Sequence, residues 1–279
     1  MKLTKRFNYG ALLASLLLVS VVVCAAEPEK KSRPSAETIK AGRALFDERC
    51  KTVAGEKIYR TVEDVEGIVL LKVRPKRSDA DLSSRDWAGA AFARESREDE
   101  FIKSFLGYEH SSSQKNEPVT LQRRGFISSD HQPKNASNLP GYRYVDVADE
   151  KTGEVWRYSL VLKPRPASTI GWIDTILERQ LAPSNRTRYG VTYEDHVIPE
   201  ERALGLASST VRVLDLKTQE VLGEMTMYAW TPGVLNMGPR GPASAVPWLS
   251  AYRCGNQLPF VGAESRQFSD QILKPHKEK

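Results

Sequence analysis

The sequence is poor in cysteine and histidine, with three cysteines and four histidines among 279 residues. It has no C-x-x-C-H run for covalent haem attachment. Neither the G-x-S-x-G elbow of many hydrolases nor the H-E-x-x-H pair of zinc proteases occurs. A tetrahedral zinc site needs three or four grouped ligands, and no such group surrounds His110, His131 or His276. We therefore expect neither a metal nor a cofactor.

Long blocks of one charge are also lacking. The chain has 41 basic and 35 acidic residues and a formal net charge of +6. Three of the basic residues fall within the first 26, so the remainder carries about +3. Nucleic-acid-binding domains typically concentrate positive charge on one face, whereas the clusters at 74–77 and 123–124 are typical of solvated loops. We expect no nucleic-acid partner.

The chain begins with the pattern of an export signal. Positive charges come first, at Lys2, Lys5 and Arg6. An apolar run of about 13 residues follows from Ala11 to Val23, shorter than the roughly 20 residues of a spanning helix. Small residues at Ala25 and Ala26 suit a cleavage site. The pattern predicts a signal peptide at 1–26 and a periplasmic mature chain at 27–279.

The three cysteines have different expected roles. Cys24 lies where a bacterial lipoprotein carries its lipid, although Val23 replaces the usual small residue before it, so membrane anchoring through Cys24 is the alternative to soluble export. Cys50 and Cys254 remain after cleavage, and a lone pair in an oxidising compartment predicts a disulfide. The alternative is a nucleophilic Cys50, which needs a nearby base that its neighbours do not supply.

Two stretches alternate apolar and polar residues as β-hairpins do, Tyr142–Leu162 and Thr210–Tyr228. Residues 145–155 and 211–221 are identical at seven of eleven positions, which raises the question of a repeat. Beyond the turns, however, the apolar residues fall on opposite parities, and a change of parity exchanges the two faces of a strand. Two independent hairpins with similar turn chemistry are therefore the favoured interpretation.

The rest of the chain mixes expected helices, strands and irregular stretches. Apolar spacing predicts helices at 36–50, 98–106, 170–181 and 264–273. Further strands are expected at 58–62 and 67–73, as a pair, and at 258–261. Periodicity is weak in a polar excursion at 107–139 and in a Pro/Gly-rich loop at 231–253. This mixture predicts a single α+β domain, with an antiparallel sheet built from hairpins and a few packed helices.

The densest group of ionisable side chains is Tyr193-Glu194-Asp195-His196. A histidine beside carboxylates suits acid–base chemistry near neutral pH. The candidate catalytic residues are therefore His196, Glu194 and Asp195, with Cys50 or a serine as nucleophile. In a polar segment before Pro199, the two carboxylates also suit turn formation and helix capping, and this is the favoured interpretation.

Three segments together resemble a group of exported proteobacterial proteins that has no assigned activity. They are G-R-x-L-F-D-E-R-C-K-T-V-A-G-E-K-I-Y-R-T-V at 42–62, W-A-G-A-A-F-A at 87–93 and R-Y-G-V-T-Y-E-D at 188–195. The resemblance implies a periplasmic or envelope location and no catalytic residues. We expect a non-enzymatic binding or structural protein that contacts another protein or an envelope component. The alternatives are a hydrolase that uses His196 and a small-ligand carrier with a pocket between sheet and helix.

Overall fold

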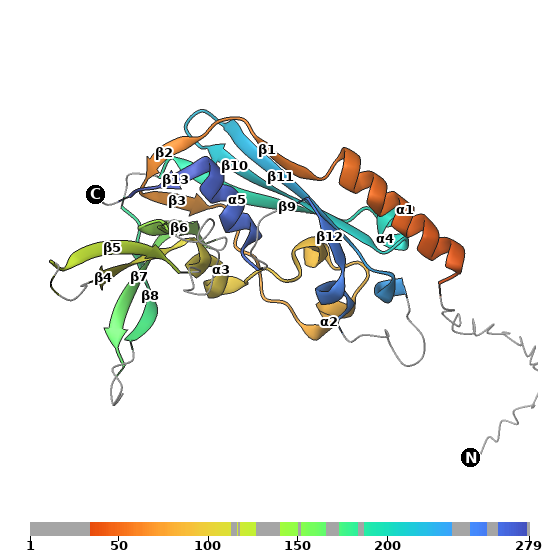
Figure 1. Cartoon of the computed structure of the whole chain (residues 1–279), viewed down its shortest axis with the longest axis horizontal. Helices are drawn as coiled ribbons and strands as arrows, with labels where there is room; N and C mark the ends of the chain where they lie inside the picture. Colours follow the sequence, from red (N-terminus) through yellow and green to blue (C-terminus); the bar gives the residue numbers. More distant parts are fainter. Residues whose placement is uncertain are drawn as a thin grey trace, which may run out of the picture. The chain divides into compact units, whose positions relative to one another are not determined.

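The structure is a computed structural model, in which residues Ser32 to Lys279 form one compact unit (Figure 1). It describes residues 34–112, 116, 118–126, 140–149, 152–165, 173–183, 187–235, 246–255 and 262–277. The expected signal peptide, Cys24 and the strand expected at 258–261 lie outside these ranges. No helix among the described residues is both long and apolar enough to cross a membrane.

The main sheet combines two antiparallel meanders. One contains β9 (Tyr189–His196), β10 (Leu206–Asp215) and β11 (Glu220–Trp230), and the other contains β6 (Tyr144–Ala148), β7 (Val155–Pro164) and β8 (Ile173–Leu181). Between them lies β3 (Gly67–Leu70), which runs parallel to both β9 and β6. The edge strand β1 (Gly55–Ile58) and the short β12 (Tyr252–Cys254) both pair with β11. The α+β class is confirmed, but the purely antiparallel sheet is wrong because β3 makes it mixed.

Two smaller sheets correct other expectations. The strands expected at 58–62 and 67–73 do not pair with each other. Instead, β2 (Val62–Val65) pairs with β13 (Leu273–Pro275) near the C-terminus. The excursion expected at 107–139 begins as a hairpin of β4 (Gly107–Ser112) and β5 (Thr120–Gly125). In the Pro/Gly-rich loop, residues 232–235 and 247–250 form short 3-10 helices, and 236–245 lie outside the described ranges.

Three of the four expected helices are present, and one is a strand. Ser35 caps α1 (Ala36–Thr52) by accepting a hydrogen bond from the Thr38 N–H. The other two are α3 (Glu98–Phe105) and α5 (Glu264–Ile272), while α2 (Asp79–Ser83) and α4 (Pro199–Ala203) are single turns. The helix expected at 170–181 is wrong, because residues 173–181 form β8 along the whole of β7. Its apolar spacing fits a helix, but the ladder with β7 decides the conformation.

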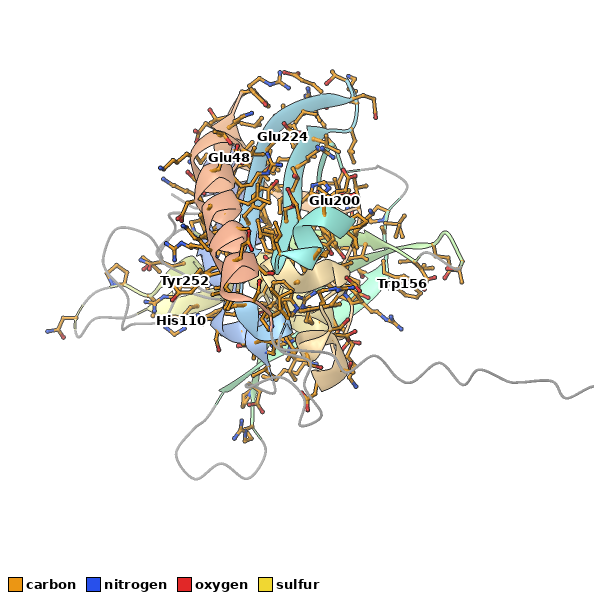
Figure 2. All side chains as sticks on the ribbon, turned by 90° about the vertical axis from the view of Figure 1, so that its right-hand side faces the viewer. Glu48, His110, Trp156, Glu200, Glu224 and Tyr252 are labelled. Carbon is orange, nitrogen blue, oxygen red and sulfur yellow. A yellow bond between two sulfur atoms is a disulfide. The ribbon has the colours of Figure 1, made fainter. Side chains whose placement is uncertain are left out.

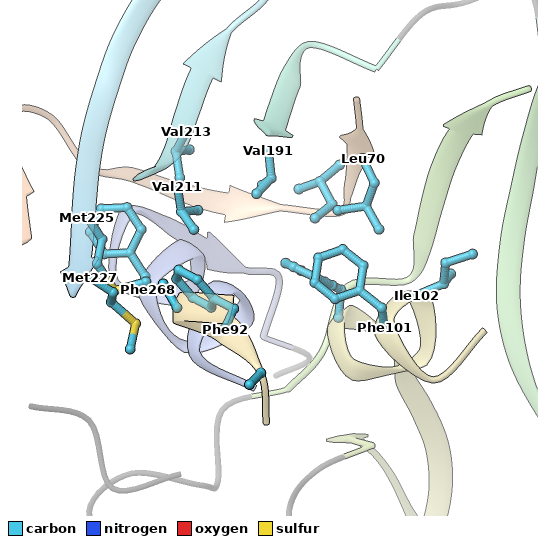
Figure 3. Close-up of a cluster of buried hydrophobic side chains, with 14 of the residues drawn as sticks. Leu70, Phe92, Phe101, Ile102, Val191, Val211, Val213, Met225, Met227 and Phe268 are labelled. Carbon is cyan, nitrogen blue, oxygen red and sulfur yellow. The ribbon is translucent and has the colours of Figure 1, made fainter. Parts of the chain in front are cut away.

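The core lies on one face of the main sheet. As the alternation predicts, Val211, Val213, Met225 and Met227 are buried on this face. Aromatic side chains pack against them from η1 (Ala88–Phe92), α3 and α5 (Figure 3). The equivalent face of β7 is less covered: Leu160 is buried, but Trp156 is half-buried and stacks with Arg179.

The opposite face of the sheet carries α1 and α4, and Figure 2 shows Glu48 and Glu200 on these two helices. Gly42 lets α1 approach closely, since a Cβ there would clash with the Leu204 carbonyl and the Trp230 indole. At the C-terminal end of α1, Cys50 is bonded to Cys254 of β12, with their Cα atoms 5.7 Å apart. The expected disulfide pairing is confirmed.

Candidate functional site

The predicted reactive cluster is divided by the strand that carries it. Glu194 and His196 project from one face of β9, because side chains alternate along a strand. The His196 Nε2 lies 3.0 Å from the Thr210 hydroxyl, and the His196 Nδ1 lies 4.0 Å from the Glu194 carboxylate. Asp195 projects to the core face, where it accepts hydrogen bonds from Arg74 at 3.0 Å and from Ser209 at 2.6 Å. Asp195 and His196 therefore do not form an acid–base pair.

The two candidate nucleophiles are not available to His196. The neighbouring Thr210 is buried, with 6% of its surface exposed, and its hydroxyl also lies 3.0 Å from the Thr226 hydroxyl. Cys50 is held in the disulfide. A hydrogen bond from Arg212 lowers the pKa of Glu194, which suits a structural carboxylate better than a general base. The arrangement does not favour the hydrolase alternative.

A pocket of about 490 Å³ lies between the main sheet and α3. Its volume falls within the range of small-molecule sites. Its sheet wall comes from β3, β6, β7 and β9, and its helix wall comes from the first turns of α3. The lining residues are Leu70, Leu71, Lys72, Val73, Arg74, Pro75, Glu98, Asp99, Ile102, Val147, Ala148, Tyr158 and Tyr193.

The mixed sheet explains where this pocket lies. Because β3, β6 and β9 are parallel, their carboxyl ends meet at one edge of the sheet, the edge at which open α/β sheets generally bind ligands. Leu70 pairs with Val147 on one side and with Val191 on the other, so the core-facing side chains continue to Tyr193, two residues beyond Val191. Below them, Phe101 and Ile102 of α3 close the core (Figure 3).

A buried arginine supports the Tyr193 wall. The Arg74 guanidinium is fully buried between two rings, 3.9 Å from the Tyr193 centroid and 4.3 Å from that of Phe92. It donates to Glu95 and Asp195, so two carboxylates compensate its charge. Burial is costly to an ion without such partners. Arg74 is therefore an immobile, buried part of the pocket wall and not a mobile surface cation.

Burial shifts the pKa values of several groups around Arg74. Burial, together with repulsion from Arg74, lowers the pKa of Arg97 to about 10. Burial also raises the pKa of Glu95, although Arg74 opposes that change. The Tyr193 pKa is raised chiefly by burial, so its hydroxyl stays protonated and donates to the Val73 carbonyl at 3.1 Å.

Charges of both signs lie on the pocket lining. The Lys72 ammonium lies 5.9 Å from the Tyr193 ring centroid. Glu98 and Asp99 begin α3, and the Glu98 N–H donates to the Arg74 carbonyl at 2.9 Å. No salt bridge joins Lys72, Glu98 or Asp99 to another residue within the described ranges. The pocket thus combines an apolar interior with one ammonium and two carboxylates.

Sequence analysis identified only Tyr193 among these pocket residues, and as part of a different site. The other lining side chains come from segments far apart in the chain, which the unexpected parallel pairing of β3 brings together. Apolar alternation could have placed Tyr158 and Tyr193 on the core faces of their strands, but it carries no information on which strands are neighbours. Within the described residues, no group of three metal-binding side chains occurs.

No protein-family model matches the chain, and no curated protein or solved structure shows significant similarity to it. The candidate site therefore rests on its own geometry and chemistry.

Proposed function

We propose that this chain is an exported, non-catalytic binding protein whose ligand site is the pocket between α3 and the carboxyl ends of β3 and β9. The observation that carries the proposal is the pocket itself. Most of its lining is apolar or aromatic, and a few lining residues are charged. Binding sites commonly have this composition, with a few polar groups that orient the ligand. The lining contains neither a histidine nor a cysteine.

The disulfide supports the export part of the proposal. Structural disulfides persist in oxidising compartments and are rare in the cytosol, and Cys50 and Cys254 form the bond in the folded chain. Mass spectrometry of the protein from its host should find a soluble chain that starts near Glu27. An intact Met1 would contradict export, and a lipid mass on Cys24 would replace soluble export by membrane anchoring.

The binding site can be tested with methyl-labelled, oxidised protein. We expect small aromatic and aliphatic amphiphiles, screened in every charge class, to shift the methyl NMR signals of Leu70 and Ile102. Val147 is half-buried beside Leu70 on the pocket lining, so Val147→Trp places a large ring in the pocket and should abolish these shifts. The matched control is Val119→Trp at a side chain 67% exposed, which should leave them unchanged. No shifts with any compound, or shifts that survive Val147→Trp, would refute the proposed site.

A further inference from the structure

The pocket's lining also narrows the chemical class of its ligand. We infer that the pocket takes a small zwitterion with an aromatic or branched apolar body, such as a free hydrophobic amino acid. This inference rests on the proposed function, since it assigns a ligand class to the same pocket.

The interior of the pocket selects for an apolar body. Leu70 and Ile102 are almost fully buried, and the half-buried Val147 lies beside them. The rings of Tyr158 and Tyr193 add two aromatic surfaces. Aromatic side chains favour offset or edge-to-face contacts with other rings and pack well against aliphatic groups. A fully polar ligand would make no favourable contact with this apolar surface, so the ligand must carry an apolar part.

A singly charged cation is disfavoured beside Tyr193. Two cations already lie close to the Tyr193 ring. The Arg74 guanidinium is 3.9 Å from the ring centroid and the Lys72 ammonium is 5.9 Å from it. Arg74 is compensated by Glu95 and Asp195. Lys72 is exposed and forms no salt bridge among the described residues, and its charge acts on Glu194 only at longer range. Lys72 therefore favours a negatively charged group on the ligand, such as a carboxylate.

A singly charged anion is disfavoured by the acidic residues of the same lining. Glu98 and Asp99 both line the pocket from the first turn of α3, and like charges repel an incoming carboxylate. An ammonium group there would gain from both. One ligand satisfies Lys72 and the first turn of α3 together only if it carries both charges. The apolar residues of the same lining then accommodate the side chain of an amino acid.

The site is held ready for binding before a ligand arrives. Tyr193 is fixed by its hydrogen bond to the Val73 carbonyl, and the beginning of α3 is fixed by the hydrogen bond from the Glu98 N–H to the Arg74 carbonyl. Val73 and Arg74 directly follow Lys72 in the chain, so the same short segment carries Lys72 and anchors the beginning of α3. Such preorganisation reduces the entropy lost on binding.

Acidic residues in a first turn also stabilise the helix itself, so binding and folding must be measured separately. The compounds for the test differ only in charge: L-phenylalanine has both charged groups, phenethylamine only the ammonium, 3-phenylpropanoate only the carboxylate and N-acetyl-L-phenylalaninamide neither. Affinities come from methyl NMR titrations of the oxidised protein at neutral pH. Thermal denaturation of each variant without ligand reports folding.

We expect L-phenylalanine to bind most tightly. Each charged group should contribute up to about fivefold in affinity, the upper scale of an ion pair with exposed residues such as Lys72 and Asp99. Lys72→Met should weaken L-phenylalanine and 3-phenylpropanoate but not phenethylamine. Asp99→Asn should weaken L-phenylalanine and phenethylamine but not 3-phenylpropanoate. The matched controls are Lys76→Met and Glu100→Gln, which alter neighbouring charges outside the pocket lining and should leave all four affinities unchanged.

Equal binding of the four compounds at the pocket, or tighter binding of a singly charged one, would overturn the zwitterion inference and leave the proposed binding function intact. Binding of L-phenylalanine that both charge variants leave unchanged would have the same consequence. If none of the four compounds, nor any other amphiphile in the screen, shifts the pocket methyls, the proposed function itself fails.

Discussion

Removing the disulfide should destabilise the protein strongly without unfolding α1. The bond joins residues separated by 204 positions. In the chain-entropy model, the entropy that a loop of this length removes raises the free energy of the unfolded state by about 5 kcal/mol at 25 °C. This is an upper value, because a compact unfolded chain loses less entropy on cross-linking. The perturbation is the double variant Cys50→Ser/Cys254→Ser, which removes the cross-link and introduces only small side chains.

Local contacts should keep α1 in place in this variant. Phe46 stacks with Trp230 at 6.2 Å between ring centroids, and the Arg49 guanidinium donates to Glu201 at 3.0 Å. The close approach at Gly42 also remains. The far-ultraviolet circular dichroism of the double variant should therefore match that of the parent, while its free energy of unfolding falls.

Urea unfolding of the oxidised parent, the reduced parent and the double variant measures this effect. With a denaturant slope of about 3 kcal/mol per molar, the midpoint should fall by between about 1 and 2 M. The reduced parent and the double variant should agree, which separates the cross-link from the packing of the two sulfur atoms. A loss below about 1 kcal/mol, or two free thiols in the denatured, non-reduced parent, would refute the reasoning.

Three further changes test the core and its buried charges by chemical denaturation. Phe268→Ala should cost about 3–5 kcal/mol as a large cavity in the core, whereas Leu181→Ala, at a side chain 59% exposed, should change stability by less than about 0.5 kcal/mol. Arg74→Met should cost about 3–5 kcal/mol because it leaves two carboxylates uncompensated. Burial raises the pKa of Asp270 to about 6, above its value in the unfolded chain, so the contribution of Asp270 to the free energy of unfolding should fall by about 2 kcal/mol as the pH rises from 4 to 6. Asp270→Asn should flatten that slope. Equal losses at the two apolar sites, a stable Arg74→Met protein or an unchanged slope would contradict these expectations.

Features set by local sequence could be predicted. Alternation placed Val211 and Met225 on the core face of one hairpin, and helical spacing placed Phe101 and Phe268 in the core. The shared K-T-x-E segment also gives two similar turns. The Thr152 and Thr218 N–H groups donate to the aspartates that begin them, and positive φ angles follow, 72° at Gly153 and 62° at Gln219. Turn chemistry depends on a few adjacent residues, which explains the agreement.

The misidentified β8 has a different physical cause. Ile176, Leu177 and Leu181 fit a helical stripe, but β8 pairs residue by residue with β7, and Leu177 pairs with Leu160. Periodicity describes which side chains an element has available for burial, while the neighbouring strand determines which conformation buries them. At the sheet edge, Ile176 and Leu181 remain exposed, so the apolar spacing that suggested a helix does not mark a buried stripe.

The candidate site follows from the same nonlocal pairing. Adjacency in the sequence grouped Tyr193 with His196, but strand alternation and the length of β9 separate them, and Asp195 turns inward to Arg74. Conversely, Lys72 and Tyr193 are remote in sequence and come together because β3 lies parallel to β9. Parallel neighbours need a long crossover connection, so no short-range pattern reveals them. In a sheet protein, residues at i and i+2 on one strand, together with the strand beside it, define a site more reliably than a run of adjacent reactive residues.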